Sequence, residues 1–196
     1  WVAAAVEYPV GRSPIALVVS DLDGDLKPDV AVANGASDSV SLLFNKGSGE
    51  FDLPAKSVAT QRGPVSLAAA DLNQDGKPEL VLAALGAGAV SVLTQDGRRS
   101  YSESRVHPVG FLPRALVAGD LNGDGRPDVA VTRRDAGTVN ILLGVGDGSF
   151  QDDTELVTGV KPDALVFANL DGKRQRDLVV ANSGSARLTI LLNQTP

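Results

Sequence analysis

The chain has 196 residues, a net charge of −6 and no cysteine. These values exclude disulfides, zinc–thiolate sites and thiol catalysis, and they argue against binding nucleic acid through its phosphates. With 21 glycines and 11 prolines, the composition indicates many tight turns rather than a helical bundle. No apolar run approaches the ~20 residues that a membrane-spanning helix needs, so no membrane insertion is expected.

Four similar segments recur at nearly equal spacing. They begin at Asp21, Asp71, Asp120 and Asn169, so the steps are 50, 49 and 49 residues. Four repeats of about 49 residues account for the whole chain. We therefore interpret residues 1–196 as a single domain built from four modules.

Each module contains the same series of short apolar runs. A proline opens the first run, an acidic segment follows it, and a second run such as the one beginning at Asp29 comes next. A turn leads to a third run, and a Gly-rich hairpin signal precedes a weaker fourth run. Short, β-branched, partly alternating runs are typical of strands. The first runs are Pro14–Ser20, Pro64–Ala70, Pro113–Gly119 and Pro162–Ala168, and the third runs are Ser39–Asn45, Ala89–Thr94, Thr138–Leu143 and Arg187–Leu192.

Four antiparallel strands in each module of about 49 residues predict an all-β fold, a β-propeller of four-stranded blades. Solenoid turns are usually shorter, and a sandwich domain of this size would bury too small a core. Trp1 aligns with the aromatic residues Phe51, Tyr101 and Phe150 at the start of the fourth run. We therefore expect residues 2–8 to supply the outer strand of the last blade, whose other strands lie in 162–192, and so to join the ends of the ring.

The acidic segment of the third module carries oxygen ligands at alternate positions. Asp120, Asn122, Asp124 and Asp128 occupy positions 1, 3, 5 and 9, and Gly125 at position 6 permits a sharp reversal. Oxygens spaced in this way on a tight loop converge on one point, with a backbone carbonyl expected at position 7, as Ca²⁺ requires. The segment is not an EF-hand, because position 12 is not Glu and strands flank the loop.

The other modules vary this pattern. The first has its glycine at position 4 and Leu26 at position 6, and the second has Glu79 at position 9. In the fourth, Lys173 at position 5 could lie near Asp171 and Asp177 and replace an ion, so we predict a metal-free loop. The predicted ligands of three Ca²⁺ sites are Asp21, Asp23, Asp25 and Asp29; Asp71, Asn73, Asp75 and Glu79; and Asp120, Asn122, Asp124 and Asp128.

An alternative is that the acidic segments are Asx-rich turns that bind no metal. However, ten of the 24 acidic residues fall in these three loops, where their like charges would repel one another at close range. Three Ca²⁺ ions would bring the formal charge from −6 to zero. Magnesium is the weaker candidate, because it prefers fewer protein ligands and more water.

The repeated D-x-[DN]-x-D-G-x-x-[DE] loop with its following apolar strand resembles the FG-GAP/VCBS repeats of integrin-α-type β-propellers. The resemblance covers all four modules and implies structural calcium at one face, held by the twelve residues named above. Ala33-Asn34-Gly35 stands where integrin repeats end in Gly-Ala-Pro, which is closer to the bacterial VCBS type. Seven blades are usual in the family. The four blades here could close alone, pair with a second chain to make eight, or belong to a longer array.

Strand order places the acidic loops at one face and a set of basic loops at the other. We expect this opposite face to bind a ligand through Arg12, Arg62, His107, Arg133, Arg134 and Lys161. The leading hypothesis is a calcium-stabilised, extracellular or cell-surface binding module, of a bacterial type, that recognises a protein or an anionic glycan and is not an enzyme. The extracellular location follows from the calcium level that weak sites need.

Two other functions stay open. The protein could be a polysaccharide hydrolase or lyase, although His107 has no Ser or Asp partner by motif and no G-x-S-x-G is present. It could also be a structural unit that assembles homo-oligomers by inserting its first strand into the open blade of a neighbouring chain.

Overall fold

The computed structural model describes residues 5–151, 154–173 and 175–194. These residues form fifteen β-strands and no helix. The strands are β1 (Pro14–Ser20), β2 (Asp29–Asn34), β3 (Ser39–Leu43), β4 (Lys56–Ala59), β5 (Pro64–Ala70), β6 (Glu79–Ala84), β7 (Ala89–Gly97), β8 (Ser100–Pro108), β9 (Pro113–Gly119), β10 (Asp128–Arg133), β11 (Thr138–Leu142), β12 (Thr154–Val157), β13 (Pro162–Ala168), β14 (Asp177–Asn182) and β15 (Arg187–Leu191).

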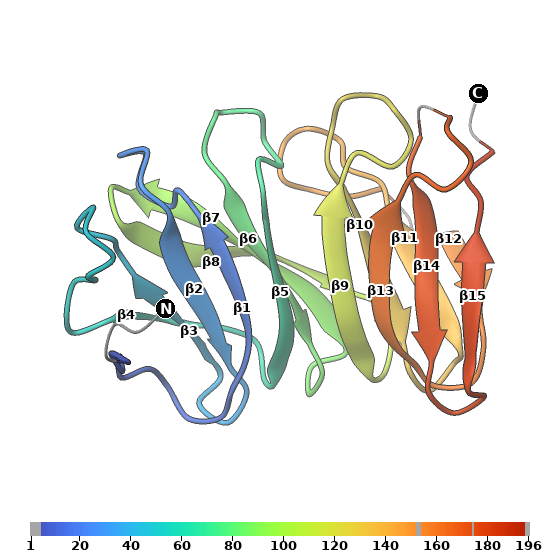
Figure 1. Ribbon diagram of the computed structural model, residues 1–196, viewed down its shortest axis with the longest axis horizontal. Coiled ribbons are helices and arrows are strands. Elements are labelled where there is room, and N and C mark those ends of the chain that lie inside the picture. Colours follow the sequence, from blue (N-terminus) through green and yellow to red (C-terminus); the bar gives the residue numbers. More distant parts are fainter. Residues whose placement is uncertain (1–4, 152–153, 174, 195–196) are drawn as a thin grey trace.

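The strands form four antiparallel sheets in chain order, which we call blades 1 to 4. Blades 1, 2 and 3 are β1–β4, β5–β8 and β9–β12, and the described part of blade 4 is β13–β15. Strand β1 packs beside β5, β5 beside β9 and β9 beside β13, so the first strands line the inside of the row (Figure 1). The predicted all-β propeller arrangement of antiparallel blades is confirmed.

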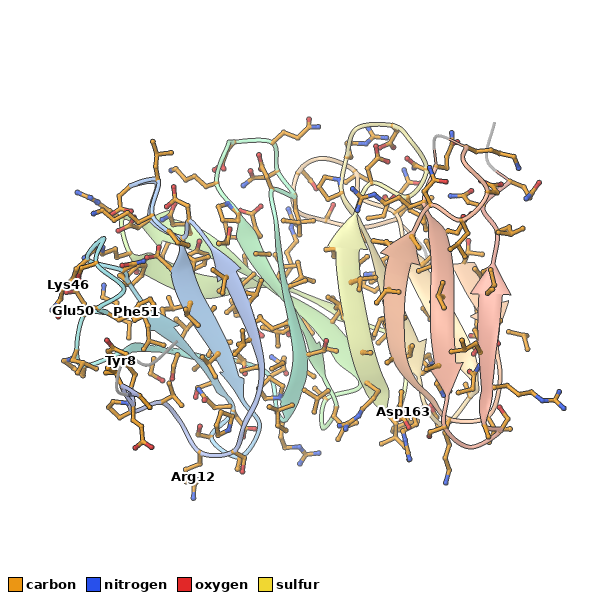
Figure 2. The ribbon with its side chains drawn as sticks, in the orientation of Figure 1. Tyr8, Arg12, Lys46, Glu50, Phe51 and Asp163 are labelled. Carbon is orange, nitrogen blue, oxygen red and sulfur yellow. The ribbon has the colours of Figure 1, made fainter. Side chains whose placement is uncertain are left out.

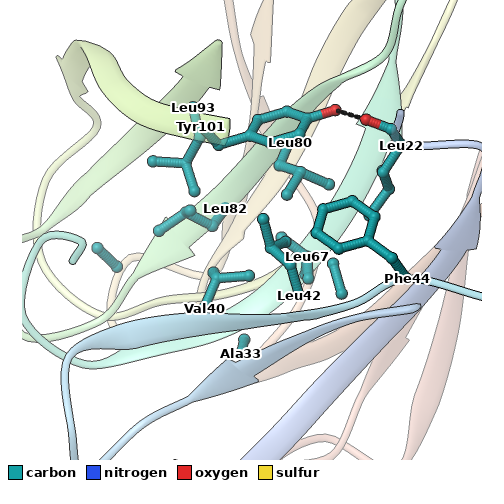
Figure 3. Close-up of a cluster of buried hydrophobic side chains, with 12 residues drawn as sticks. Leu22, Ala33, Val40, Leu42, Phe44, Leu67, Leu80, Leu82, Leu93 and Tyr101 are labelled. Atoms are coloured by element: carbon teal, nitrogen blue, oxygen red, sulfur yellow. Dashed lines mark hydrogen bonds between the residues drawn. The ribbon is translucent and has the colours of Figure 1, made fainter. Parts of the chain in front are cut away.

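Apolar side chains fill the space between successive blades. Between blades 1 and 2, Val40 and Leu42 of β3 pack in one cluster with Leu67 of β5 and Leu82 of β6 (Figure 3). Two equivalent clusters lie between blades 2 and 3 and between blades 3 and 4. Both faces of a blade in the middle of the row are therefore buried, which explains the near-continuous apolar runs of β6 and β7.

The described residues of the segment before β1 do not form the outer strand that the repeat alignment predicts for residues 2–8. Residues 5–10 form no strand, and the Tyr8 ring packs edge-on against Phe51 of blade 1, with 5.2 Å between ring centroids (Figure 2). Blade 4 lies at the opposite end of the row (Figure 1). Residues 5–8 of the chain therefore do not pair with its own last blade, because three blades lie between them. The rest of the expected strand, residues 2–4, is outside the described residues.

The described part of the chain contains no helix that is long and apolar enough to cross a membrane.

Candidate metal centre

The four acidic segments connect the first and second strands of their blades and lie at the same end of the molecule (Figure 1). We call them loop 1 (21–29), loop 2 (71–79), loop 3 (120–128) and loop 4 (169–177). The common placement follows from the repeat, since every first strand runs in the same direction through the row.

The carboxylate at position 1 organises the backbone of each of loops 1 to 3. Asp120 accepts hydrogen bonds from the N–H groups of Gly123 (2.7 Å) and Gly125 (2.9 Å). Asp21 likewise accepts from the N–H groups of Gly24 (2.8 Å) and Leu26 (2.8 Å). Because these backbone N–H groups all donate to the position-1 carboxylate, the loop backbone wraps around that side chain.

Loops 1 to 3 each have two residues in the left-handed backbone conformation, at positions 4 and 6. In loop 3 both are glycines, Gly123 and Gly125, each with φ of 82°. In loop 1, Gly24 takes position 4 but position 6 is Leu26, with φ of 66°. Gly24 therefore corresponds to Gly123 of loop 3 and not to Gly125. Loop 1 has no glycine at position 6, although the backbone there is left-handed, a conformation that favours glycine.

The carboxylate at position 9 is buried in all four loops and closes each loop against its blade. Asp128 accepts the N–H of Leu121 (2.9 Å) on one oxygen and the N–H of Gly144, just beyond β11, on the other (2.9 Å). Asp29 and Asp177 make the same pair of contacts in loops 1 and 4. Glu79 accepts the N–H of Leu72 and the amide of Asn73. Position 9 is thus a structural clamp, a role that the ligand pattern did not predict.

Burial raises the pKa of Asp29, Glu79 and Asp128 above the ordinary values of these carboxyl groups. Neighbouring carboxylates add to this effect: Asp23 and Asp25 raise the pKa of Asp29. The surroundings of Asp29, Glu79 and Asp128 thus disfavour their ionised forms, and a nearby cation would relieve that cost.

Loop 1 brings three carboxylates together. One oxygen each from Asp21, Asp23 and Asp29 lies within 4.8 Å of the other two. Three hard oxygen ligands at this separation fit a calcium ion, which is bound by six to eight oxygens at 2.3–2.6 Å. The donor set of loop 1 is therefore suited to the ion that the resemblance implies.

Arg99, in the hairpin between β7 and β8, also reaches loop 1. Its guanidinium contacts Asp23, lies 3.8 Å from Asp25, and hydrogen-bonds to Asp52 at 2.7 Å. The aromatic ring of Phe44 lies under the guanidinium, 5.0 Å away. Arg99 thus neutralises part of the acidic charge of loop 1 from the next blade. The sequence offered one weak signal for it: this hairpin reads Asp-Gly-Arg-Arg, whereas the equivalent hairpins carry no arginine.

Loops 2 and 3 have an amide at position 3, where loop 1 has Asp23. Asn122 receives the N–H of Asp124 on its oxygen (2.9 Å) and donates to Asp124 through its nitrogen (3.1 Å). Arg126 also contacts Asp124, at 2.6 Å. In the described residues these loops therefore do not form the three-carboxylate set of loop 1, although their backbone framework is the same.

Loop 4 contains an ion pair of its own. Lys173 Nζ lies 2.8 Å from Asp171, as predicted, and this contact lowers the pKa of Asp171. The side-chain oxygen of Asn169, at position 1, accepts the N–H of Gly172 at 2.8 Å. An ammonium group is therefore built into the loop at the position where loops 1 to 3 carry Asp.

The six residues expected to bind a ligand are only partly gathered at the opposite end. Arg12 (Figure 2) and Arg62 are exposed in equivalent loops. The Arg12 guanidinium donates to the carbonyl of Ala36 (3.1 Å), and that of Arg62 donates to the carbonyl of Gly86 (2.9 Å). Arg133 pairs with Glu155 at 3.0 Å and Arg134 with Asp163 at 2.7 Å. Acidic partners thus offset part of the expected positive charge.

Lys161 is exposed just before β13, and His107 lies in β8 rather than in a loop. The His107 ring packs edge-on against Phe150 of the next blade, with 6.2 Å between centroids. His107 therefore contributes to packing between blades. A ligand-binding role for the six residues stays a prediction.

Comparison with solved structures shows the fold in longer chains. The BBS1N chain of a complex with ARL6DN is 18% identical, with a TM-score of 0.66 over 95% of this chain and 53% of that one. A lectin of Agrocybe aegerita that recognises non-reducing terminal N-acetylglucosamine is 21% identical (TM-score 0.61; 90% and 52% covered). A putative 6-phosphogluconolactonase of Bacteroides uniformis is 15% identical (TM-score 0.66; 92% and 51% covered). The chain spans about half the length of these structures.

Comparison with curated proteins found no match. A family model described as an FG-GAP-like repeat matches three overlapping segments, residues 21–82, 74–131 and 120–180. Each match begins in an acidic loop or spans one, and together they cover most of the chain. The chain therefore belongs to the family of proteins built from FG-GAP-like repeats.

Proposed function

We propose that the protein is a non-catalytic binding module that works outside the cell, with Ca²⁺ held by loops 1, 2 and 3. The convergence of Asp21, Asp23 and Asp29 within 4.8 Å carries this proposal. Asp25 completes the proposed ligand set of loop 1. The proposed ligands in loops 2 and 3 are the residues at the same positions: Asp71, Asn73, Asp75 and Glu79; and Asp120, Asn122, Asp124 and Asp128. Bound calcium would neutralise the carboxylates and stiffen one end of the propeller.

Two further observations support calcium. Burial raises the pKa values of Asp29, Glu79 and Asp128 in loops 1 to 3, so a divalent cation beside these carboxyl groups would stabilise their ionised form. The loop backbones of blades 1 and 3 are alike, because both have left-handed residues at positions 4 and 6. Sites of this kind in extracellular modules are weak, with dissociation constants of about 10⁻⁴–10⁻³ M, which is why we place the protein outside the cell.

Thermal unfolding with and without calcium tests the metal sites. At 10 mM free Ca²⁺, a site with a dissociation constant of ~1 mM adds about 1.4 kcal/mol, so three sites add about 4 kcal/mol. For a chain of this length each kcal/mol raises the melting temperature by about 2–4 °C. We expect a rise of about 10 °C over a sample in chelator. An unchanged melting temperature would contradict the proposal.

The variant Asp21→Asn tests how much of the calcium-induced rise in melting temperature comes from loop 1. Asn169 holds the equivalent position in loop 4, so an amide is compatible with the fold. The variant should lose about a third of the calcium-induced rise. Glu50→Gln is the matched control, because it removes one negative charge from an exposed residue in the hairpin between β3 and β4 and should keep the full rise.

For the ligand, we propose an acidic protein surface or an anionic glycan bound at the end that carries Arg12 and Arg62. Backbone carbonyls position both guanidinium groups in exposed loops. Binding to a polyuronate in low salt should fall at least tenfold in the Arg12→Ala/Arg62→Ala variant. It should not change in Lys46→Ala, which removes a charge from a distant hairpin. Equal binding by both variants would refute this face as the site.

A further inference from the structure

Two repeat positions change from apolar or small side chains in blades 1 and 2 to charged or polar ones in blades 3 and 4. The first position is the second residue of the inner strand, and its occupants in chain order are Ile15, Val65, Arg114 and Asp163. The second position directly follows the second strand, and its occupants are Gly35, Leu85, Arg134 and Ser183. We call Arg114, Arg134, Asp163 and Ser183 the polar set.

The backbone at the second position is the same in all four blades. Its N–H donates to the carbonyl of the residue just before the inner strand, and the four pairs are Gly35 to Ser13 (2.9 Å), Leu85 to Gly63 (2.8 Å), Arg134 to Leu112 (3.1 Å) and Ser183 to Lys161 (2.9 Å). Because this contact does not depend on the side chain, the fold of a blade does not require the polar set.

Asp163 joins the polar groups of blades 3 and 4. It begins the inner strand of blade 4 at the end of the molecule that carries Arg12 (Figure 2). One of its carboxylate oxygens lies 2.7 Å from Arg134 Nε, and the other accepts the hydroxyl of Ser183. The Ser183 hydroxyl, followed by the guanidinium groups of Arg134 and Arg114, lowers the pKa of Asp163. An ionised Asp163 therefore holds the Arg134 guanidinium in place.

The two arginines keep hydrogen-bond donors for a ligand. Asp163 contacts Arg134 through Nε, and within the described part of the chain the two terminal nitrogens of that guanidinium have no acceptor. Arg114 is exposed and makes no hydrogen bond or ion pair with residues 5–151, 154–173 or 175–194. Unpaired guanidinium donors beside a held one are suited to an anionic group.

The same arginines line a cavity of about 250 Å³. Asp163 borders it as well, and Leu85 and Leu112 form its apolar wall. These five residues come from blades 2, 3 and 4. Sites for drug-sized ligands have volumes of about 300–1,000 Å³, so this cavity suits one small unit that has an anionic edge and an apolar face.

We propose that this cavity binds one hexuronate unit of an anionic glycan, with the sugar carboxylate between Arg114 and Arg134 and the sugar ring against the two leucines. The inference rests on the proposed binding function and deepens it. The exposed arginines before β1 and β5 attract the polyanion, whereas the cavity selects the uronate. A guanidinium can bind a planar carboxylate through two parallel N–H bonds, which an ammonium group cannot do.

The cavity favours a sugar over an acidic peptide. In a uronate the carboxylate is attached to a rigid ring with apolar C–H groups, whereas Asp and Glu carry it on a flexible chain that loses rotamer freedom on binding. Phe111 precedes the cavity residue Leu112 and is 78% exposed. It stands where blades 1 and 2 have Arg12 and Arg62. An exposed aromatic ring at this place provides a flat apolar surface for the next sugar unit.

NMR titration of the isotope-labelled chain with trigalacturonate in low salt tests the site. We expect the Arg134 Nε signal and the backbone signals of Leu85 and Leu112 to shift. Arg114→Gln and Arg134→Gln should each weaken binding by about tenfold or more, because each removes charged donors. Arg114→Lys should also weaken it, although it keeps the charge. Arg105→Gln is the matched control, since it removes an exposed arginine of β8 outside the cavity and should bind as the wild type does.

Asp163→Ala separates the orientation of Arg134 from the net charge of the cavity. The variant makes the cavity more positive, so a site that depended on charge alone would bind trigalacturonate more tightly. We expect weaker binding, because the Arg134 guanidinium is no longer held. Methyl-esterified trigalacturonate, which has no charge, should not shift the cavity signals of the wild type.

The outcomes distinguish failure of this inference from failure of the proposed function. Unchanged binding in both glutamine variants, together with a loss in Arg12→Ala/Arg62→Ala, would overturn the cavity and leave the proposed binding end intact. A wild type whose cavity signals do not shift would overturn the cavity and leave an acidic protein as the proposed ligand. Triglutamate that binds as tightly as trigalacturonate would overturn the choice of a sugar.

Discussion

Loop 1 of blade 1 and loop 4 of blade 4 close against their blades in the same way but carry different charges at position 5. Asp29 and Asp177 each accept the N–H at position 2 of the loop and an N–H beyond the third strand of the blade. Position 5 is Asp25 in loop 1 and Lys173 in loop 4, where the ammonium pairs with Asp171. The comparison separates two positions: the carboxylate at position 9 closes the loop in both blades, whereas the charge at position 5 differs, and we propose that Asp25 helps to bind an ion that the Lys173 ammonium replaces in loop 4.

Removal of the position-9 carboxylate should have the largest effect. Asp29→Ala and Asp177→Ala each leave two backbone N–H groups without an acceptor in a buried setting, so each should lower the free energy of unfolding by about 2–4 kcal/mol without calcium. Urea unfolding measures the loss. With 10 mM calcium, Asp29→Ala should lose more, because loop 1 then also fails to bind its ion, whereas the loss in Asp177→Ala should not change.

Asp147→Ala is the control for both variants. Asp147 is exposed in the hairpin of blade 3 and pairs with Arg105 at 3.6 Å, so its removal should cost far less stability than removal of either buried carboxylate. If Asp177→Ala costs no more than this control, position 9 is not a structural clamp.

Lys173→Asp should give loop 4 the carboxylate that loop 1 has at position 5. The change removes an exposed ion pair and adds a like charge beside Asp171, so without calcium we expect a small loss of stability. In calcium the variant should bind one more ion than the wild type, which equilibrium dialysis measures. Lys173→Ala should lose the ion pair without gaining an ion. If Lys173→Asp binds no additional ion, position 5 does not decide the cation.

The sequence predicted the features that depend on one module at a time. The spacing of prolines and apolar runs predicted the first strand of every blade, and strand order predicted that the acidic loops share one end. It did not predict which charged side chains meet across modules. Arg99 reaches Asp23 across 76 residues of sequence, and Arg134 pairs with Asp163 of the next blade. Such pairs depend on how successive blades stack, and the pattern within a repeat carries no information about that.

The same limit applies to the ends of the chain. Repeat alignment assigned residues 2–8 to the outer strand of the last blade, but residues 5–10 form no strand and the Tyr8 ring packs on Phe51 of blade 1. Alignment could not show that the last blade of the same chain lies at the far end of the row. That result follows from the angle between blades, which the packing of side chains in the three interfaces determines.

The smallest expected effect concerns position 6 of loop 1. Leu26 has φ of 66° and is 91% exposed, whereas loop 3 has Gly125 there. A left-handed conformation costs a residue with a side chain about 1–2 kcal/mol, and the greater freedom of glycine in the unfolded chain offsets part of the gain. Leu26→Gly should therefore raise the free energy of unfolding by about 0.5–1 kcal/mol in urea, with or without calcium. Phe111→Gly, at an exposed loop residue outside the left-handed region, should lower it. If both variants lose stability equally, loop 1 is not strained at position 6, and its difference from loop 3 lies only in its charges.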